Sequence, residues 1–178
     1  MIDFLAYDNA DHVLHGRIAF EGDRLADLLA SRTTIDVEGL RVRSLLRKEL
    51  RRPASPTVSL AGVCLVIATG PSGSQYKRLL TVFSPVTIHA GPYLVHGYLH
   101  APQPQSPIKV AEHRTWLALT EAVLEYTYHW QAIRERHDVL LVNRLLAKAL
   151  IVTDERSHES RWLAGRAPID WPAMQDDL

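Results

Sequence analysis

The chain has 178 residues, of which 47% are apolar and 22% are charged, and its formal net charge at pH 7 is zero. This composition is ordinary for a soluble globular protein, and a chain of this length can bury a sizeable core without disulfides. The zero net charge excludes a pull of the whole molecule toward nucleic acid or a membrane, so any such attraction has to come from a local patch.

The first residues and the single cysteine indicate the cellular compartment in which we expect the protein. Residues 1–4 lack the basic start and long apolar core of a signal peptide, and no apolar run in the chain reaches membrane-spanning length. A single cysteine, Cys64, excludes an internal disulfide, and its apolar neighbours predict a small buried side chain. We therefore expect a soluble, cytoplasmic protein with no membrane partner.

A repeated pattern organises the chain. Residues 13–18 and 94–99 share the order apolar-apolar-His-Gly-x-apolar at an offset of 81, and residues 32–37 match residues 114–119 at an offset of 82. A fixed offset over successive segments indicates an internal repeat, here of about 80 residues. The expected parts are a first repeat, a linker with the start of the second repeat, the second repeat and a C-terminal tail, over residues 1–70, 71–83, 84–152 and 153–178.

Each copy is expected to begin with a β-hairpin. In the first copy, residues 2–7 and 12–20 read as strands around a turn-rich segment. In the second copy, residues 85–89 and 93–100 repeat this arrangement around a turn that contains Gly91 and Pro92.

A short helix is expected after each hairpin. In the first copy, Asp23 can cap a helix that carries Leu25, Leu28 and Leu29 on one face. In the second copy, Ser106 serves as the cap and Pro107 as the first helical residue, and Ile108 and Ala111 face inward.

Two further strands per copy follow the helices. Residues 33–42 alternate apolar and polar side chains with a change of phase at Gly39, which predicts a strand with a bulge. Residues 116–128 are the counterpart; a helix competes there because residues 117–124 contain no breaker, but the parallel with the first copy favours a strand. The apolar runs 58–68 and 139–151 predict buried strands.

The remaining segments are expected to lie outside the repeated elements. Residues 44–56 and 129–138 read as insertions, residues 69–76 as the link between the halves, and residues from 153 onward as a polar tail that holds Trp162 and Trp171. The sequence therefore predicts a mainly β fold with short helices (α+β), built as an internal tandem duplication of a small barrel-like or sandwich-like unit.

Glycines and turn residues at matching places carry a family resemblance. Gly16, Gly97, the Ala61-Gly62 step and Asn143-Arg144 lie at places comparable to those of the Sm-like (LSm) small β-barrels, which carry a strand with an apolar-x-Gly signature and a last strand with a Gly or Asn turn. Residues 3–68 and 84–151 each resemble this family for that reason. The chain departs from that family because its helix lies inside each half and the family's RNA-contacting Asp and Asn have no match. Residues 24–29 also look like part of a class of uncharacterised bacterial proteins with duplicated domains, which supports duplication and implies no chemistry.

Histidines at equivalent positions are the first candidate site. His15 and His96 each precede a glycine, and a repeated ligand or proton site is one hypothesis. A strand histidine packed beside glycine is favoured, because neither copy has a matching carboxylate or second histidine. His89, His96 and His100 suggest zinc, but His96 and His100 would lie roughly 13 Å apart along a strand. We therefore expect no metal and no cofactor.

A basic stretch is the second candidate site. Six basic residues occur between positions 41 and 52 with Glu49 as the one acidic residue, and they are Arg41, Arg43, Arg47, Lys48, Arg51 and Arg52. Guanidinium groups in such a run can bind phosphates. The competing interpretation is a solvated surface over Leu45, Leu46 and Leu50, and it is favoured because short charge runs usually face water. No aromatic side chain interrupts the stretch, so base stacking is not expected.

The sequence favours a non-catalytic binding or scaffold protein that self-associates or binds another protein. The alternative is a nucleic-acid-binding Sm-like module that uses the basic stretch. An enzyme ranks third, because the glycine-rich residues 70–74 lack the Gly-Lys-Ser/Thr of a phosphate loop and no catalytic constellation is apparent. Strongly salt-dependent binding to an oligonucleotide would separate the second hypothesis from the first.

Overall fold

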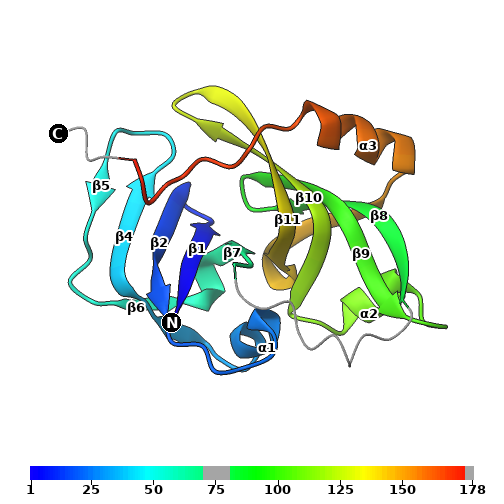
Figure 1. Ribbon diagram of the computed structural model, residues 1–178, viewed down its shortest axis with the longest axis horizontal. Coiled ribbons are helices and arrows are strands. Elements are labelled where there is room, and N and C mark those ends of the chain that lie inside the picture. Colours follow the sequence, from blue (N-terminus) through cyan, green and yellow to red (C-terminus); the bar gives the residue numbers. More distant parts are fainter. Residues whose placement is uncertain (70–80, 175–178) are drawn as a thin grey trace.

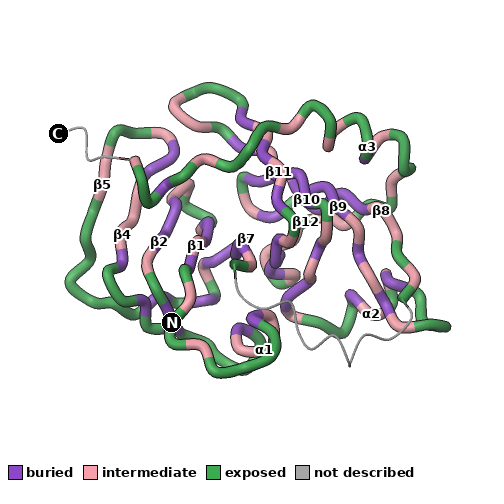
Figure 2. The backbone as a smooth tube through the Cα atoms, viewed as in Figure 1, coloured by how far each residue is buried: buried purple, intermediate pink, exposed green. Residues whose placement is uncertain are grey.

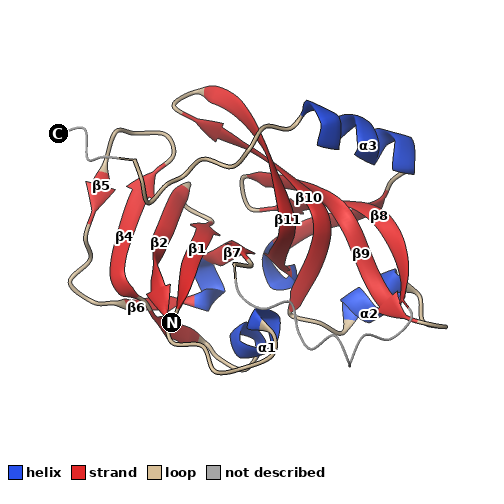
Figure 3. Ribbon diagram, viewed as in Figure 1, coloured by secondary structure: helices blue, strands red, loops and turns tan. Residues whose placement is uncertain are grey.

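The computed structural model describes residues 1–69 and 81–174, and these form a mainly β fold with three short α-helices at its periphery (Figure 3). The strands in chain order are β1 (Ile2–Asp8), β2 (His12–Ile18), β3 (Thr34–Asp36), β4 (Glu38–Ser44), β5 (Leu50–Arg51), β6 (Thr57–Ser59), β7 (Val63–Ile67), β8 (Thr81–Ala90), β9 (Tyr93–Pro102), β10 (Trp116–Tyr128), β11 (Gln131–Asn143) and β12 (Ala147–Val152). The α-helices are α1 (Leu25–Ala30), α2 (Pro107–Glu112) and α3 (Glu155–Ala164).

One large antiparallel sheet contains ten of these strands, in the order β12-β8-β9-β10-β11-β7-β1-β2-β4-β5 (Figure 1). Strands β3 and β6 form a separate two-stranded sheet. The large sheet is open, with β12 and β5 at its edges, so the described residues form no closed barrel. The barrel-like part of the sequence prediction is therefore wrong, because β7 pairs with β11 across the two halves instead of each half closing on itself.

The hairpins and the bulge agree with the sequence prediction. β1 pairs with β2, and β8 pairs with β9 over ten residue pairs, so the second hairpin is longer than predicted. Residues 116–128 are a strand, β10, and not the competing helix. The predicted bulge is present at Gly39, which has φ +66° and lies where the pairing of β2 with β4 shifts register. The single strand predicted over residues 33–42 is wrong, because β3 pairs with β6 in the small sheet while β4 pairs with β2 in the large one.

The helices begin close to the predicted positions. α2 starts at Pro107 with Ser106 as its N-cap, and its Ala111 is buried while Ile108 is half-buried. α1 differs at its start, because Arg24 and not Asp23 is the N-cap residue. Leu25 and Leu29 are buried, and Leu28 is only half-buried.

The two long apolar runs are not continuous strands. A 3₁₀ turn, η1 (Leu60–Gly62), separates β6 from β7, and a second turn, η3 (Arg144–Leu146), separates β11 from β12. The side chain of Asn143 stabilises both turns: its Nδ2 donates to the carbonyls of Leu60 and Val63 at 3.2 and 3.0 Å, and its Oδ1 accepts from the Leu145 amide. The prediction of one strand over each run is therefore wrong.

The two segments predicted as insertions, residues 44–56 and 129–138, have different structures. Residues 131–138 belong to β11, so the second insertion is the continuation of a long hairpin with β10. The first insertion contains β5, and its Leu45 is fully buried. The predicted link lies outside the described residues except for Thr69, and residues 81–83 belong to β8.

The C-terminal segment packs against the sheet and is not a loose tail. It contains α3 and then crosses toward β4 and β5 (red in Figure 1), with Trp171 fully buried. The Trp171 Nε1 donates to the Tyr7 hydroxyl at 3.1 Å, and the Ile169 amide donates to Glu135 Oε1 at 2.9 Å. Because Tyr7 lies on β1 and Glu135 on β11, this segment joins the first half of the sheet to the second.

The buried side chains form two clusters, and each contains residues from both halves of the chain. Buried residues are frequent along β7, β10 and β11 (purple in Figure 2). Cys64 is buried in the larger cluster, as the sequence predicts, and burial raises the pKa of its thiol to about 11. The thiol is therefore protonated and unreactive at neutral pH.

Candidate anion-binding surface

The basic stretch is held in place by the strand that carries its first residues and by the leucine that follows it. In β4, Leu40 and Ser44 are buried, and Arg41 and Arg43 lie between them on the opposite face. Leu45 is buried, its amide donates to the Asp11 carbonyl at 2.8 Å, and its carbonyl accepts from the His129 amide at 2.8 Å. These contacts fix the backbone from which the arginines project.

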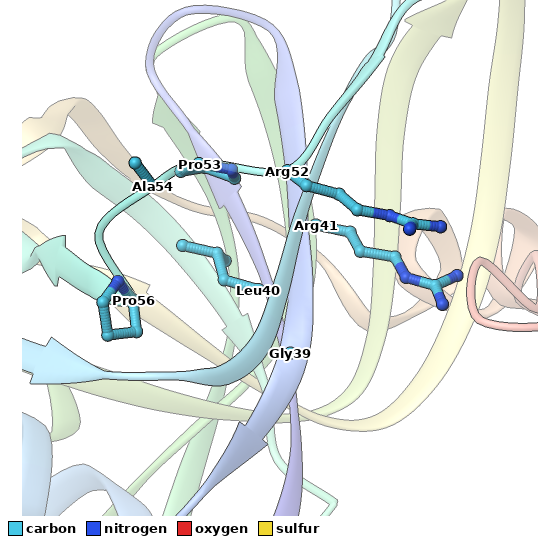
Figure 4. Close-up of a pocket in the computed structure, with 7 residues that line it drawn as sticks. All are labelled: Gly39, Leu40, Arg41, Arg52, Pro53, Ala54 and Pro56. Carbon is cyan, nitrogen blue, oxygen red and sulfur yellow. The ribbon is translucent and has the colours of Figure 1, made fainter.

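Arg41 and Arg52 lie next to one another. Val42 pairs with Arg51 between β4 and β5, so the next step of this register places Arg41 beside Arg52. Both side chains extend in the same direction, away from Leu40 and Pro56 (Figure 4). Together they line a hollow of about 390 Å³, whose other walls are Gly39, Leu40, Pro53, Ala54 and Pro56.

The other four basic residues of the stretch do not line this hollow. Arg51 is paired with Glu49, with Nε and Nη2 at 2.9 and 2.7 Å from Oε1. Arg43 Nη2 donates to the carbonyl of Met174 at 3.3 Å in the C-terminal segment. Arg47 and Lys48 are exposed at the turn between β4 and β5. The structure thus brings together two of the six residues that the sequence groups as one patch.

Local sequence patterns do not predict that Arg41 and Arg52 lie next to one another. They are eleven positions apart, and their pairing depends on where the short strand β5 begins. Leu50 and Arg51, which form this strand, are flanked by charged residues and by Pro53, and nothing in this composition indicates a strand. A hairpin prediction centred between Val42 and Arg51 would have found the pair.

His15 and His96 each precede a glycine on the second strand of a hairpin, but their surroundings differ. His15 is buried on β2, where it pairs with Arg41 of β4. His96 is buried on β9; its Nδ1 lies 2.7 Å from Thr87 Oγ1 and its Nε2 lies 3.3 Å from Glu125 Oε1. Burial, with the charge of Arg161, lowers the pKa of His96 to about 4 despite the opposing effect of Glu125.

The histidines of the second hairpin do not gather into a site. His89 is exposed on β8, and His100 Nε2 lies 2.7 Å from Thr120 Oγ1, away from His96. Within residues 1–69 and 81–174, no group of three or more His, Cys, Asp or Glu side chains is arranged to hold a metal ion.

Gly16 and Gly97 lie where the second strand of each hairpin passes close to the next strand. A β-carbon on Gly16 would lie 2.5 Å from Val37 Cγ1 and 2.7 Å from the Glu38 carbonyl oxygen. On Gly97 it would lie 3.0 Å from Leu119 Cβ and 3.1 Å from the Thr120 carbonyl oxygen. Both glycines therefore stand at close backbone approaches.

Local sequence patterns also do not predict the buried polar cluster around Glu135, which lies beneath the C-terminal segment. Glu135 is fully buried, and its Oε1 accepts hydrogen bonds from the Tyr126 hydroxyl at 2.9 Å and from Ile169. His137 Nε2 lies 3.5 Å from Oε2 of Glu135. Burial, with the charge of Glu135 adding to it, raises the pKa of Tyr7 well above its usual value, so this phenol stays protonated. This group joins three parts of the chain and is closed to solvent.

In comparisons with known proteins, no family model, curated protein or solved structure matches the chain. Among the described helices, none combines the length and apolar character needed to cross a membrane. The structure therefore defines a mainly β chain with an open ten-stranded sheet and a paired-arginine hollow at one end of it.

Proposed function

We propose that the chain is a non-catalytic binding protein that self-associates and presents the hollow beside Arg41 and Arg52 to a phosphate-bearing partner, of which nucleic acid is the first to test. The side-by-side placement of these two arginine side chains at the margin of one hollow carries the proposal. Guanidinium forks match the geometry of phosphate oxygens, and an anion placed between two like charges offsets their mutual repulsion.

The rest of the site favours backbone contact over base recognition. The walls of the hollow are aliphatic and proline side chains, which offer no flat aromatic surface for stacking. Arg51 is paired with Glu49, and Arg43 donates to the C-terminal segment. Binding of this kind is sequence-independent and depends strongly on salt.

The test is a titration of short DNA and RNA oligonucleotides at several salt concentrations. Replacing Arg41 and Arg52 together by Ala should weaken binding and make the slope of log affinity against log salt shallower by about 1.8 for duplex DNA, or 0.9 per lost contact. The matched control is the Arg47→Ala, Lys48→Ala pair, which removes the same charge from the exposed turn and should change the slope much less. Absence of binding at low salt, or equal losses in both pairs, would contradict the proposal.

We also propose that the two halves are copies of one unit. The pairing order β7-β1-β2-β4 in the first half and β12-β8-β9-β10 in the second half supports this, as does a helix after the second strand of each. Gly39 and Glu121 add support, because both have positive φ and lie at a register shift, between β2 and β4 for Gly39 and between β9 and β10 for Glu121. An Sm-like ancestry of the unit is the finer proposal, supported by the close strand approaches at Gly16 and Gly97.

An experimental structure tests the duplication directly. If residues 3–68 and 84–151 are copies, their strands should superpose in the same order with Gly16 on Gly97. Halves that share no common superposition of these four strands would refute the duplication.

A further inference from the structure

Two strands that each follow a 3₁₀ turn, β7 in the first half and β12 in the second, differ sharply in burial. β7 follows η1 and pairs with β1, and β12 follows η3 and pairs with β8. β7 is paired on its other edge by β11, and all five of its residues are buried. In the described part of the chain no strand pairs with the other edge of β12, and its Ile151 and Val152 are 51% and 58% exposed.

The composition of β12 suits a buried strand. Lys148 is its one charged residue, and the other five are Ala, Ala, Leu, Ile and Val. An apolar strand at the edge of a sheet offers unpaired backbone groups and apolar side chains, which is the usual template for pairing with another chain. The edge of β12 therefore needs a strand of the kind that β11 supplies to β7.

The first half offers an edge of that kind. The part of β11 that pairs with β7 lies just before η3, and β6 lies just before η1. β6 pairs with β3 on one edge, and the described residues place no strand on its other edge. A hollow of about 320 Å³ borders β6 and has a mixed lining, in which apolar side chains such as Leu40, Val42 and Val58 stand beside polar ones such as Asp8 and Asn9.

We infer that β12 of one copy pairs antiparallel with β6 of a second copy, so that the β7–β11 junction inside the chain is repeated between chains. The inference rests on the proposed duplication and names the self-association partner as a second copy of this chain. The two edges lie on different parts of the surface, so the contact is head-to-tail and each copy keeps one free edge of each kind. Such a contact extends into a ring or a filament.

Two single substitutions test this contact. Ile151→Lys places a charge on the β12 edge, and Ser59→Lys places one on β6; both residues are exposed, so each monomer should keep its fold by circular dichroism. In sedimentation velocity over a concentration series, the wild type should grow beyond a dimer and each variant alone should stay monomeric. An equimolar mixture of the two variants should form a heterodimer, because one intact β12 and one intact β6 remain.

The control is Leu163→Lys on α3, which replaces another exposed apolar residue and should associate like the wild type. A wild type that stays monomeric throughout the series would overturn the inference. So would association that Ile151→Lys removes and Ser59→Lys leaves intact, because that result indicates a two-fold β12–β12 contact. Ile151→Lys keeps Arg41 and Arg52 and lies at the opposite edge of the large sheet from β5, so oligonucleotide binding by this variant reports on the proposed anion site separately.

Discussion

Gly16 shows how one side chain fixes the path of two strands. β2 passes Val37 and the carbonyl of Glu38 so closely that a β-carbon at position 16 has no room, and one of the two contacts is with backbone, which cannot swing aside. The same close approach at Gly97 is looser by about half an ångström. The glycine thus allows the bend at Gly39 that brings β4 alongside β2.

Gly16→Ala should therefore lower the free energy of unfolding by about 1–3 kcal/mol, as overpacking in a core does. The matched control is Gly62→Ala, where the nearest atom to the added carbon is Asn9 Oδ1 at 3.7 Å. Urea denaturation of both variants provides the measurement. If Gly16→Ala is no less stable than Gly62→Ala, the close approach of the strands does not require a glycine at position 16.

His96 predicts a pH dependence of stability. Its pKa is lowered from 6.5 to about 4 in the folded protein, so the folded state favours the neutral ring and the unfolded chain binds a proton at higher pH. Stability should fall as the pH drops from about 6.5 toward about 4, and burial lowers the pKa of His158 and His100 in the same sense. The midpoint of urea denaturation, followed over this range, measures the effect.

His96→Gln removes one of these titrations, so the fall in midpoint between about pH 6.5 and pH 4 should become shallower than in the wild type. The readout is this slope and not the stability at a single pH, because loss of the contact with Thr87 lowers stability at every pH. A slope equal to that of the wild type would show that His96 is not buried in its neutral form.

The structure of the C-terminal segment differs more than that of any other described element from what its sequence predicts. Its composition is polar, yet Trp171 is fully buried, contacts Tyr128 edge-on at 5.2 Å between ring centroids, and bonds to Tyr7. The segment also donates a hydrogen bond from the Ile169 amide to the buried carboxylate of Glu135. It therefore acts as a strap over the junction of the two halves.

Trp171→Ala should cost about 3–5 kcal/mol of stability, the usual loss for a large buried aromatic side chain. Trp130→Ala is the control, because Trp130 is 81% exposed in a turn and its loss should change stability by less than about 0.5 kcal/mol. Calorimetric unfolding of the two variants separates a strap from a loose tail. Equal melting temperatures would contradict the packing of Trp171.

Local patterns were sufficient to predict the hairpins, the bulge at Gly39 and the strand at residues 116–128, because alternation and turn residues act over a few positions. They failed at Leu60–Gly62, where the side chains suit a strand and the turn depends on Asn143, eighty residues away. They failed again at Trp171, whose partners lie on β1 and β10. The basic stretch was found by composition, but which two arginines converge depends on strand register.

At the scale of the whole molecule, the sheet runs continuously from β12 to β5 and carries distinct surfaces at its two ends. The exposed apolar edge of β12 lies at one end, and the hollow beside Arg41 and Arg52 lies at the other, next to the terminal strand β5. The β6 edge proposed for self-association adjoins the second surface, because the hollow that borders β6 shares Leu40 and Pro53 with the hollow beside Arg41 and Arg52.

A second basic hollow is the competing site for an anion. It has a volume of about 580 Å³, adjoins α2 and includes Lys109, His113 and Arg114. Its basic side chains come from a short helix and the residues after it, while Arg41 lies on β4 and Arg52 directly follows the paired strand β5. The strand-held pair should therefore bind phosphate groups with less loss of side-chain freedom.

The most direct measurement is an amide chemical-shift titration of the full chain with a short oligonucleotide at low salt. The proposed binding role predicts that the largest shifts fall on β4, β5 and residues 52–56, and that they vanish in the Arg41→Ala, Arg52→Ala variant. Shifts centred on α2, or shifts that the double variant leaves unchanged, would contradict it.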